Sequence, residues 1–143
     1  MPGDNSRNEQ VKIICAEDCG NAPKKEFLRA FNVAFVSNDS GFIMEKIIDD
    51  IQWNFIGNNV LQGKDEVLRM LEKLISKKPT ELVISNIITH GYSGSLNGIL
   101  KLGDHTSYAF CHVYRFNSSL NKTKIKEITS YIVDISKTSN ADS

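Results

Sequence analysis

A regular alternation runs through Tyr108-Ala109-Phe110-Cys111-His112-Val113-Tyr114-Arg115-Phe116. The even positions carry four aromatic rings and one histidine, and the odd positions carry smaller or charged side chains. Successive side chains of a β-strand point to opposite faces, so this stretch predicts a strand with one face of large rings. An aromatic face that also holds a titratable group is typical of a ligand pocket, although the same rings can pack against a helix.

The segments around this strand have the same character. Residues 81–92, 95–102 and 124–135 are rich in Ile, Val, Tyr and Phe, and clusters of Gly, Asn, Asp and Ser separate them. Together with residues 106–116 they predict four long strands joined by hairpins, which is an antiparallel meander.

The first half of the chain has a helical period instead. Phe27, Phe31 and Phe35 recur every four residues after Pro23, which predicts an amphipathic helix of about four turns. Further helices are expected at residues 42–47 and 64–76, with a strand at 51–55 between them. Helices followed by a run of strands indicate an α+β fold in which N-terminal helices pack on a curved antiparallel sheet.

The length of 143 residues allows one domain. We expect an N-terminal arm over residues 1–20 with a short extended piece at 11–15, the α+β domain over 21–136, and a flexible tail over 137–143.

The bulk composition excludes several classes of partner. The 17 basic and 17 acidic residues cancel to a net charge of zero, so the chain has no electrostatic footprint for nucleic acid or an anionic membrane. No apolar run is long enough to span a bilayer, and the polar N-terminus lacks the apolar core of a secretory signal.

An odd number of cysteines forms no disulfide framework, so we expect a cytoplasmic protein with free thiols. Cys15 and Cys19 are spaced i, i+4, but no second pair follows at ligand spacing. The sequence therefore predicts no metal site, and we expect no cofactor.

The order of the elements resembles that of the nuclear transport factor 2-like superfamily, over residues of about 20–135. The resemblance is carried by Asp49–Trp53, Gln62–Val67, His112–Phe116 and Lys124–Ile128 ending in Tyr131, and by Glu17–Lys25, which is similar to the opening of uncharacterised bacterial members. The family includes ketosteroid isomerases, SnoaL-like cyclases and limonene epoxide hydrolase. The resemblance implies a cone-shaped fold with a deep pocket and a homodimer that forms through the outer face of the sheet.

The resemblance also permits a comparison of functional positions. The general-base aspartate of the ketosteroid isomerases corresponds to Phe55, their oxyanion-hole tyrosine falls at about Phe31, and their second oxyanion donor falls on His112. A phenylalanine cannot abstract a proton, so the resemblance implies that catalysis of the isomerase type is absent. Chemistry like that of limonene epoxide hydrolase needs two carboxylates and an arginine around a water, and Glu127 and Asp134 lie on opposite faces of their strand.

The predicted pocket combines the inward positions of the strands with one helix residue. Its members are Phe31, Trp53, Phe55, Leu96, Tyr108, Phe110, His112, Tyr114, Ile128, Ser130 and Ile132.

Three hypotheses for function stay open at this point. The first is a protein that binds a hydrophobic small molecule, with His112 as its polar contact. The second is a SnoaL-like isomerase, cyclase or hydrolase in which His112 acts as acid or base, with Ser130 or Tyr108 as helper. The third is a dimeric interaction module whose pocket is filled by its own side chains.

Overall fold

The computed structural model describes residues 11–16, 22–118 and 122–136. In chain order its elements are β1 (Lys12–Cys15), α2 (Pro23–Val36), α3 (Ser40–Lys46), β2 (Ile47–Phe55), β3 (Val60–Gln62), α4 (Lys64–Ser76), β4 (Pro79–His90), β5 (Ser93–Leu102), β6 (Ser107–Phe116) and β7 (Ile125–Asp134). The predicted domain limits stay a prediction, because most of the arm and tail lies outside the described residues. No helix in these ranges is both long enough and apolar enough to cross a membrane.

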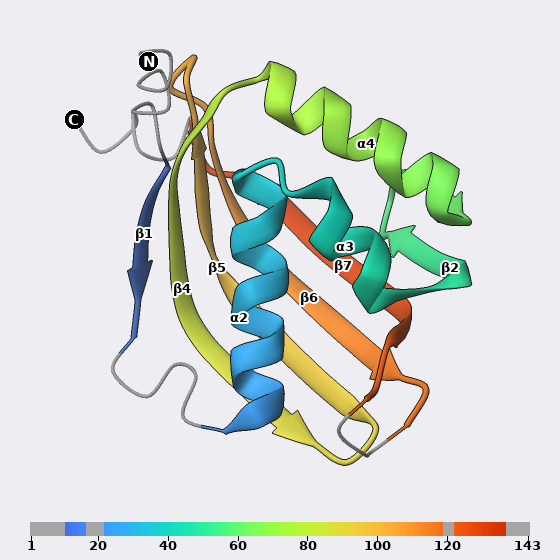
Figure 1. The fold of residues 1–143 in the computed structure, drawn as a ribbon. Coiled ribbons are helices and arrows are strands. Elements are labelled where there is room, and N and C mark those ends of the chain that lie inside the picture. The colour runs from blue at the N-terminus through green and yellow to red at the C-terminus, as the bar shows by residue number, and fades with distance from the viewer. Residues whose placement is uncertain (1–10, 17–21, 119–121, 137–143) are drawn as a thin grey trace, which may run out of the picture.

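The strands form one curved sheet in the order β1-β4-β5-β6-β7-β2-β3. The pairs from β4 to β7 are antiparallel, which confirms the predicted meander, whereas β2 joins β7 in parallel and β1 joins β4 in parallel. Figure 1 shows the sheet curving around α2, while α4 lies across the end of the sheet toward which the C-terminus of α2 points. The α+β cone predicted from the sequence is therefore the fold of the chain.

The core lies between α2 and the concave face of the sheet. Phe31 is buried, and its ring meets those of Phe35 and Tyr114 edge-on at centroid distances of 5.3 and 6.2 Å. Phe35 in turn meets the Trp53 indole edge-on at 5.3 Å. Phe27 is half-buried and packs on Phe116 at 5.8 Å, so the helical stripe predicted from the period of the phenylalanines is the face that covers the sheet.

Two short elements differ from the sequence prediction. α3 begins at Ser40 rather than at residue 42, because the Asp39 carboxylate accepts a hydrogen bond from the Phe42 backbone N–H at 3.2 Å and caps the helix. β3 was not predicted, since three residues are too few to show an alternation. It forms because Val60–Gln62 can pair with β2, which starts at Ile47 instead of residue 51.

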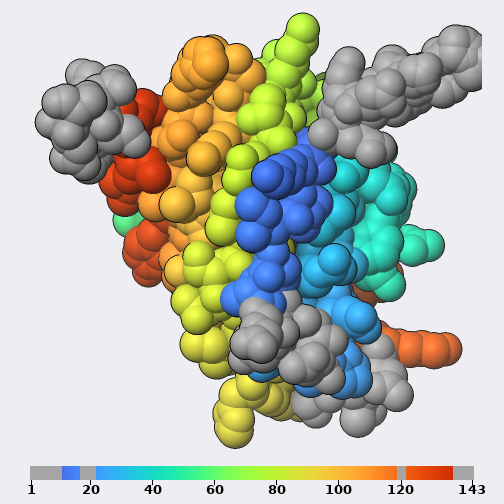
Figure 2. Space-filling model, turned by 90° about the vertical axis from the view of Figure 1, so that its left-hand side faces the viewer, coloured from blue at the N-terminus to red at the C-terminus, as the bar shows by residue number. Residues whose placement is uncertain are grey.

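β1 covers the β4 edge of the sheet. Figure 2 shows this strand, in blue, between the yellow-green surface of β4 and the lighter blue surface of α2. The Glu81–Ile84 stretch of β4 is thereby paired and no longer presents its ladder groups to another chain, and β1 becomes the edge strand on this side of the sheet.

The predicted free thiols are only partly found. Cys111 is free, but Cys15 is disulfide-bonded, so the prediction of a free thiol is wrong there. Cys19 lies outside the described residues. Disulfides persist in oxidising compartments, so the cytoplasmic location stays a prediction that Cys15 does not support.

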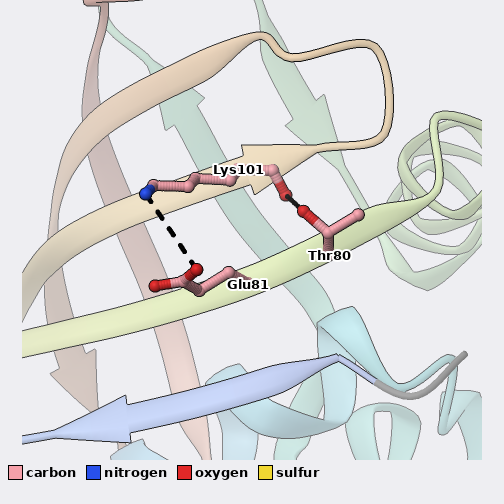
Figure 3. Close-up of polar contacts among 3 residues, drawn as sticks. All are labelled: Thr80, Glu81 and Lys101. Atoms are coloured by element: carbon pink, nitrogen blue, oxygen red, sulfur yellow. Dashed lines mark hydrogen bonds and ion pairs between the residues drawn. The ribbon is translucent and has the colours of Figure 1, made fainter.

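Two register shifts interrupt the β4–β5 ladder, and the first lies at the start of β4. Pro79 pairs with Leu102 and Glu81 pairs with Lys101, which leaves Thr80 as the extra residue. Its hydroxyl donates to the Lys101 carbonyl at 3.2 Å, and Lys101 Nζ lies 4.0 Å from Glu81 Oε1 (Figure 3). The side chains thus satisfy a carbonyl at a place where the ladder is interrupted.

The second irregularity lies between Ile84 and Asn86, and it explains Gly98. A Cβ atom on Gly98 would stand 1.8 Å from the Val83 carbonyl oxygen, so the two backbones approach more closely than any other residue allows.

We predict that Gly98→Ala lowers the free energy of unfolding by about 2 kcal/mol or more, because the backbone atom it meets cannot move away without breaking the ladder. Urea unfolding followed by circular dichroism measures this. Gly41→Ala is the matched control, since its Cβ has nothing closer than 3.9 Å and a helical alanine is favoured over glycine. An unfolding midpoint for Gly98→Ala equal to that of the wild type would contradict the close approach.

Candidate functional site

A cavity of about 850 Å³ lies between the inner face of the sheet and α4. Its wall on the sheet side is largely apolar and includes Trp53, Phe55, Leu82, Leu100, Phe110 and Ile132. Phe35 and Val36, at the C-terminal end of α2, bound it on the side of the core. The cavity therefore occupies the part of the concave sheet that α2 does not reach.

The opposite wall is one face of α4. Glu66, Arg69, Met70, Lys73 and Leu74 contribute to it, and their spacing of three or four residues places them on one side of the helix. Val67 and Leu71 are buried against the core and hold this face in position.

The start of α4 is fixed by the chain just before it. The Gln62 backbone N–H donates to Glu66 Oε1 at 2.7 Å, and the Gly63 N–H donates to the Ile51 carbonyl at 2.8 Å. Gly63 has φ of +87°, which is a conformation that side chains rarely adopt. These contacts hold the first turn of the helix against β2.

A chain of hydrogen bonds joins three neighbouring strands behind the cavity. The Trp53 indole N–H donates to Ser130 Oγ at 2.8 Å, and Ser130 Oγ lies 2.6 Å from His112 Nδ1. Sheet register brings the groups together, because Ser130 stands directly between His112 on β6 and Phe55 on β2. Ser130 is only 1% exposed, so these partners take the place of water.

The same contacts favour one tautomer of His112. Ser130 Oγ accepts from Trp53, and its own O–H has no acceptor among the described residues other than His112 Nδ1, which favours the neutral imidazole with its proton on Nε2. Burial lowers the pKa of His112 from 6.5 to about 4, so the ring is neutral at pH 7. Its face stacks on Phe110 with centroids 4.7 Å apart.

The Nε2 atom of His112 is open to the cavity. No residue in the described part of the chain bonds to Nε2, although every fully buried side-chain nitrogen and oxygen there has a partner. It follows that Nε2 has accessible surface, and His112 is part of the cavity wall. The site thus presents one oriented, uncharged N–H donor.

A second polar group comes from α2. Asn32 Nδ2 donates to the Leu28 carbonyl at 2.8 Å and to Tyr114 Oη at 2.9 Å, which leaves Oδ1 as an acceptor at the cavity wall. Burial raises the pKa of Tyr114 far above its usual value, so the phenol stays protonated. Asn32 is absent from the pocket predicted from the sequence. One feature of the sequence could have indicated it: Asn32 lies four positions from both Leu28 and Val36, so it is a polar residue within the buried stripe of α2.

The structure separates the predicted pocket residues into two groups. Those that line the cavity are Trp53, Phe55, Tyr108, Phe110, His112 and Ile132. Those that lie outside its wall, each at most 1% exposed, are Phe31, Leu96, Tyr114, Ile128 and Ser130. Phe31 and Tyr114 belong to the packing of α2 on the sheet, and Ser130 acts behind the wall through His112.

Comparison with known proteins identifies this arrangement. No family model matches the chain, and neither does any curated protein. A solved NTF2-like (nuclear transport factor 2-like) protein of unknown function from Cytophaga hutchinsonii is 27% identical, with a TM-score of 0.58 over 73% of this chain and 95% of its own. The chain has the fold of the NTF2-like superfamily.

Other NTF2-like structures share the fold at lower identity. A protein of unknown function from Burkholderia pseudomallei is 16% identical, with a TM-score of 0.64 over 78% of this chain and 92% of its own. An LEH-like epoxide hydrolase from M. tuberculosis is 17% identical, with a TM-score of 0.59 over 74% of this chain and 79% of its own.

The buried histidine makes the stability of this NTF2-like protein depend on pH. His112 takes up a proton near pH 6.5 in the unfolded chain but only near pH 4 in the folded one, so stability falls as the pH drops between these values. We predict a loss of roughly 2 to 3 kcal/mol, since one pKa unit corresponds to about 1.4 kcal/mol and the ring keeps some access to the cavity.

Urea unfolding at pH 7 and at pH 4.5 measures this loss. His112→Gln is the control, because its amide oxygen can accept from Ser130 but does not titrate, and it should lose less stability over this range than the wild type. The same loss in both proteins would show that other groups cause it.

Proposed function

We propose that this NTF2-like protein binds a hydrophobic small molecule in the cavity beside His112. The observation that carries the proposal is the cavity itself: about 850 Å³ with an apolar, aromatic wall and few polar groups. Ligand pockets for small molecules have volumes of about 300–1,000 Å³ and this kind of lining.

His112 would fix the orientation of the ligand. Its Nε2–H is a donor without a protein partner among the described residues, and the Ser130 contact prevents the ring from turning. A carbonyl, ether or hydroxyl oxygen on the ligand matches such a donor, because a bound apolar molecule would otherwise leave the N–H unpaired.

Catalysis by His112 is the second hypothesis, and it has less support. With a pKa of about 4 the ring is already deprotonated at pH 7, so it cannot act as an acid there and is a weak base. Ser130, its predicted helper, uses its hydroxyl to hold Nδ1. Phe55 supplies only carbon to the cavity wall, which agrees with the loss of the isomerase base that the resemblance implies.

A filled pocket was the third hypothesis. A volume well below a few hundred Å³ would have favoured it, and the cavity exceeds that value.

Binding is tested with 1-aminoanthracene, an uncharged apolar dye whose emission rises when it leaves water. We predict saturable binding to the wild type, and at least about tenfold weaker binding to Ile132→Trp, which places a larger side chain in the wall. Ile14→Trp is the matched control, since Ile14 is the same residue type, is 40% exposed against 45% for Ile132, and lies on β1 outside the cavity wall.

Absence of saturable binding to the wild type would contradict the proposal. Equal weakening by Ile132→Trp and Ile14→Trp would place the dye outside the cavity.

We also propose that the protein forms a homodimer through the outer face of the sheet. This face carries exposed apolar side chains on neighbouring strands, namely Ile88, Val113, Tyr131 and Val133, which are 38–63% exposed. Clustered apolar side chains on a sheet face are a feature of protein interfaces.

Light scattering at tens of micromolar tests the dimer, for which we predict twice the 16.0 kDa of the chain. Tyr131→Arg should shift the protein to monomer, because it places a charge in the centre of the apolar face. Tyr92→Arg is the control, as Tyr92 is similarly exposed but lies in the turn between β4 and β5. A monomeric wild type would refute the dimer.

A further inference from the structure

The charged side chains of the cavity wall all lie on α4 or directly after it. Glu66, Arg69 and Lys73 lie on α4, and Lys77 directly follows it. We call Arg69, Lys73 and Lys77 the α4 rim; all three are exposed, whereas the sheet side of the cavity is apolar. The cavity is therefore polarised, with cations at one wall and carbon at the other.

Two of the rim cations, Arg69 and Lys73, form no ion pair in the described part of the chain. Among the described residues the ion pairs are Lys64 with Asp49 and Lys101 with Glu81, and neither Arg69 nor Lys73 has a carboxylate within 4.0 Å. Glu66 is held at the other end of the helix by the Gln62 N–H.

Lys77 differs from the other two rim residues. Hydrogen bonds from Thr106 lower the pKa of Asp104, and the charge of Lys77 adds to this, so Lys77 already has an acidic neighbour. Arg69 and Lys73 are thus the uncompensated pair. Because the whole chain has a net charge of zero, this excess is local to the cavity.

The stability of α4 itself explains only one of these two cations. A cation in the last turn is stabilised by the helix dipole, which explains Lys73 and not Arg69, which lies near the middle of α4. Residues four apart on a helix are about 6 Å from one another along the axis, so one carboxylate can lie between both side chains.

We infer that the ligand is an amphipathic carboxylate, with its apolar body against the aromatic wall and its carboxylate at Arg69 and Lys73. This inference rests on the proposed binding function and adds the ligand class. The opposite orientation is disfavoured, since a carboxylate at the neutral His112 would be buried without a countercharge. At the rim the carboxylate keeps contact with water as well as with two cations.

The test compares decanoate with 1-decanol as competitors of 1-aminoanthracene. The two molecules have the same chain and differ in charge. At low ionic strength we expect decanoate to displace the dye at about tenfold lower concentration than 1-decanol does. This advantage should shrink in 0.5 M NaCl, where the Debye length is about 4 Å, because salt screens the charges of the exposed rim.

The double variant Arg69→Gln/Lys73→Gln should abolish the advantage of decanoate and leave displacement by 1-decanol unchanged. Lys124→Gln/Lys126→Gln is the matched control: it changes the net charge equally at exposed positions outside the cavity wall and should preserve the advantage.

The outcomes separate the two proposals. Failure of the dye itself to bind contradicts the binding function. Binding of the dye with equal displacement by decanoate and 1-decanol leaves the binding function intact and overturns the carboxylate class. An advantage that disappears equally in both double variants assigns it to net charge and also overturns the inference.

Discussion

The hydrogen bonds around Ser130 Oγ are the contact on which the polar character of the cavity depends. This one atom accepts from the Trp53 indole and meets His112 Nδ1, so it connects β2, β7 and β6. The parallel pairing of β2 with β7 is required for it, because that register brings Trp53 beside the Ser130 strand. A buried hydroxyl in this position favours the tautomer of the histidine that carries its proton on Nε2, so that the cavity meets a donor rather than an acceptor.

Most of the fold can be predicted from the local periodicity of apolar residues in the sequence. The four strands of the meander are readable from alternation, and α4 spans the predicted residues 64–76, because its apolar face repeats every three to four residues. β3 and the early start of β2 are not readable in this way, since a three-residue strand exists only through its partner.

The alternation of a strand predicts the face of a side chain but not the depth at which it lies. On β6, Tyr114 and Phe116 are covered by α2, while Tyr108, Phe110 and His112 extend past the end of that helix into the cavity. Where a helix stops over a sheet depends on tertiary packing, which no local pattern contains. The α4 rim is hidden for a similar reason, as cations on a helix are ordinarily a solvated face.

The position of Trp53 has a practical consequence. It is the only tryptophan of the chain, and its indole stacks on Phe55 in the cavity wall with centroids 5.2 Å apart. Any molecule that displaces water from that wall changes the surroundings of the single chromophore that dominates near-ultraviolet emission. The protein thus carries an intrinsic optical reporter of cavity occupancy, and unlabelled protein is sufficient to screen compounds against it.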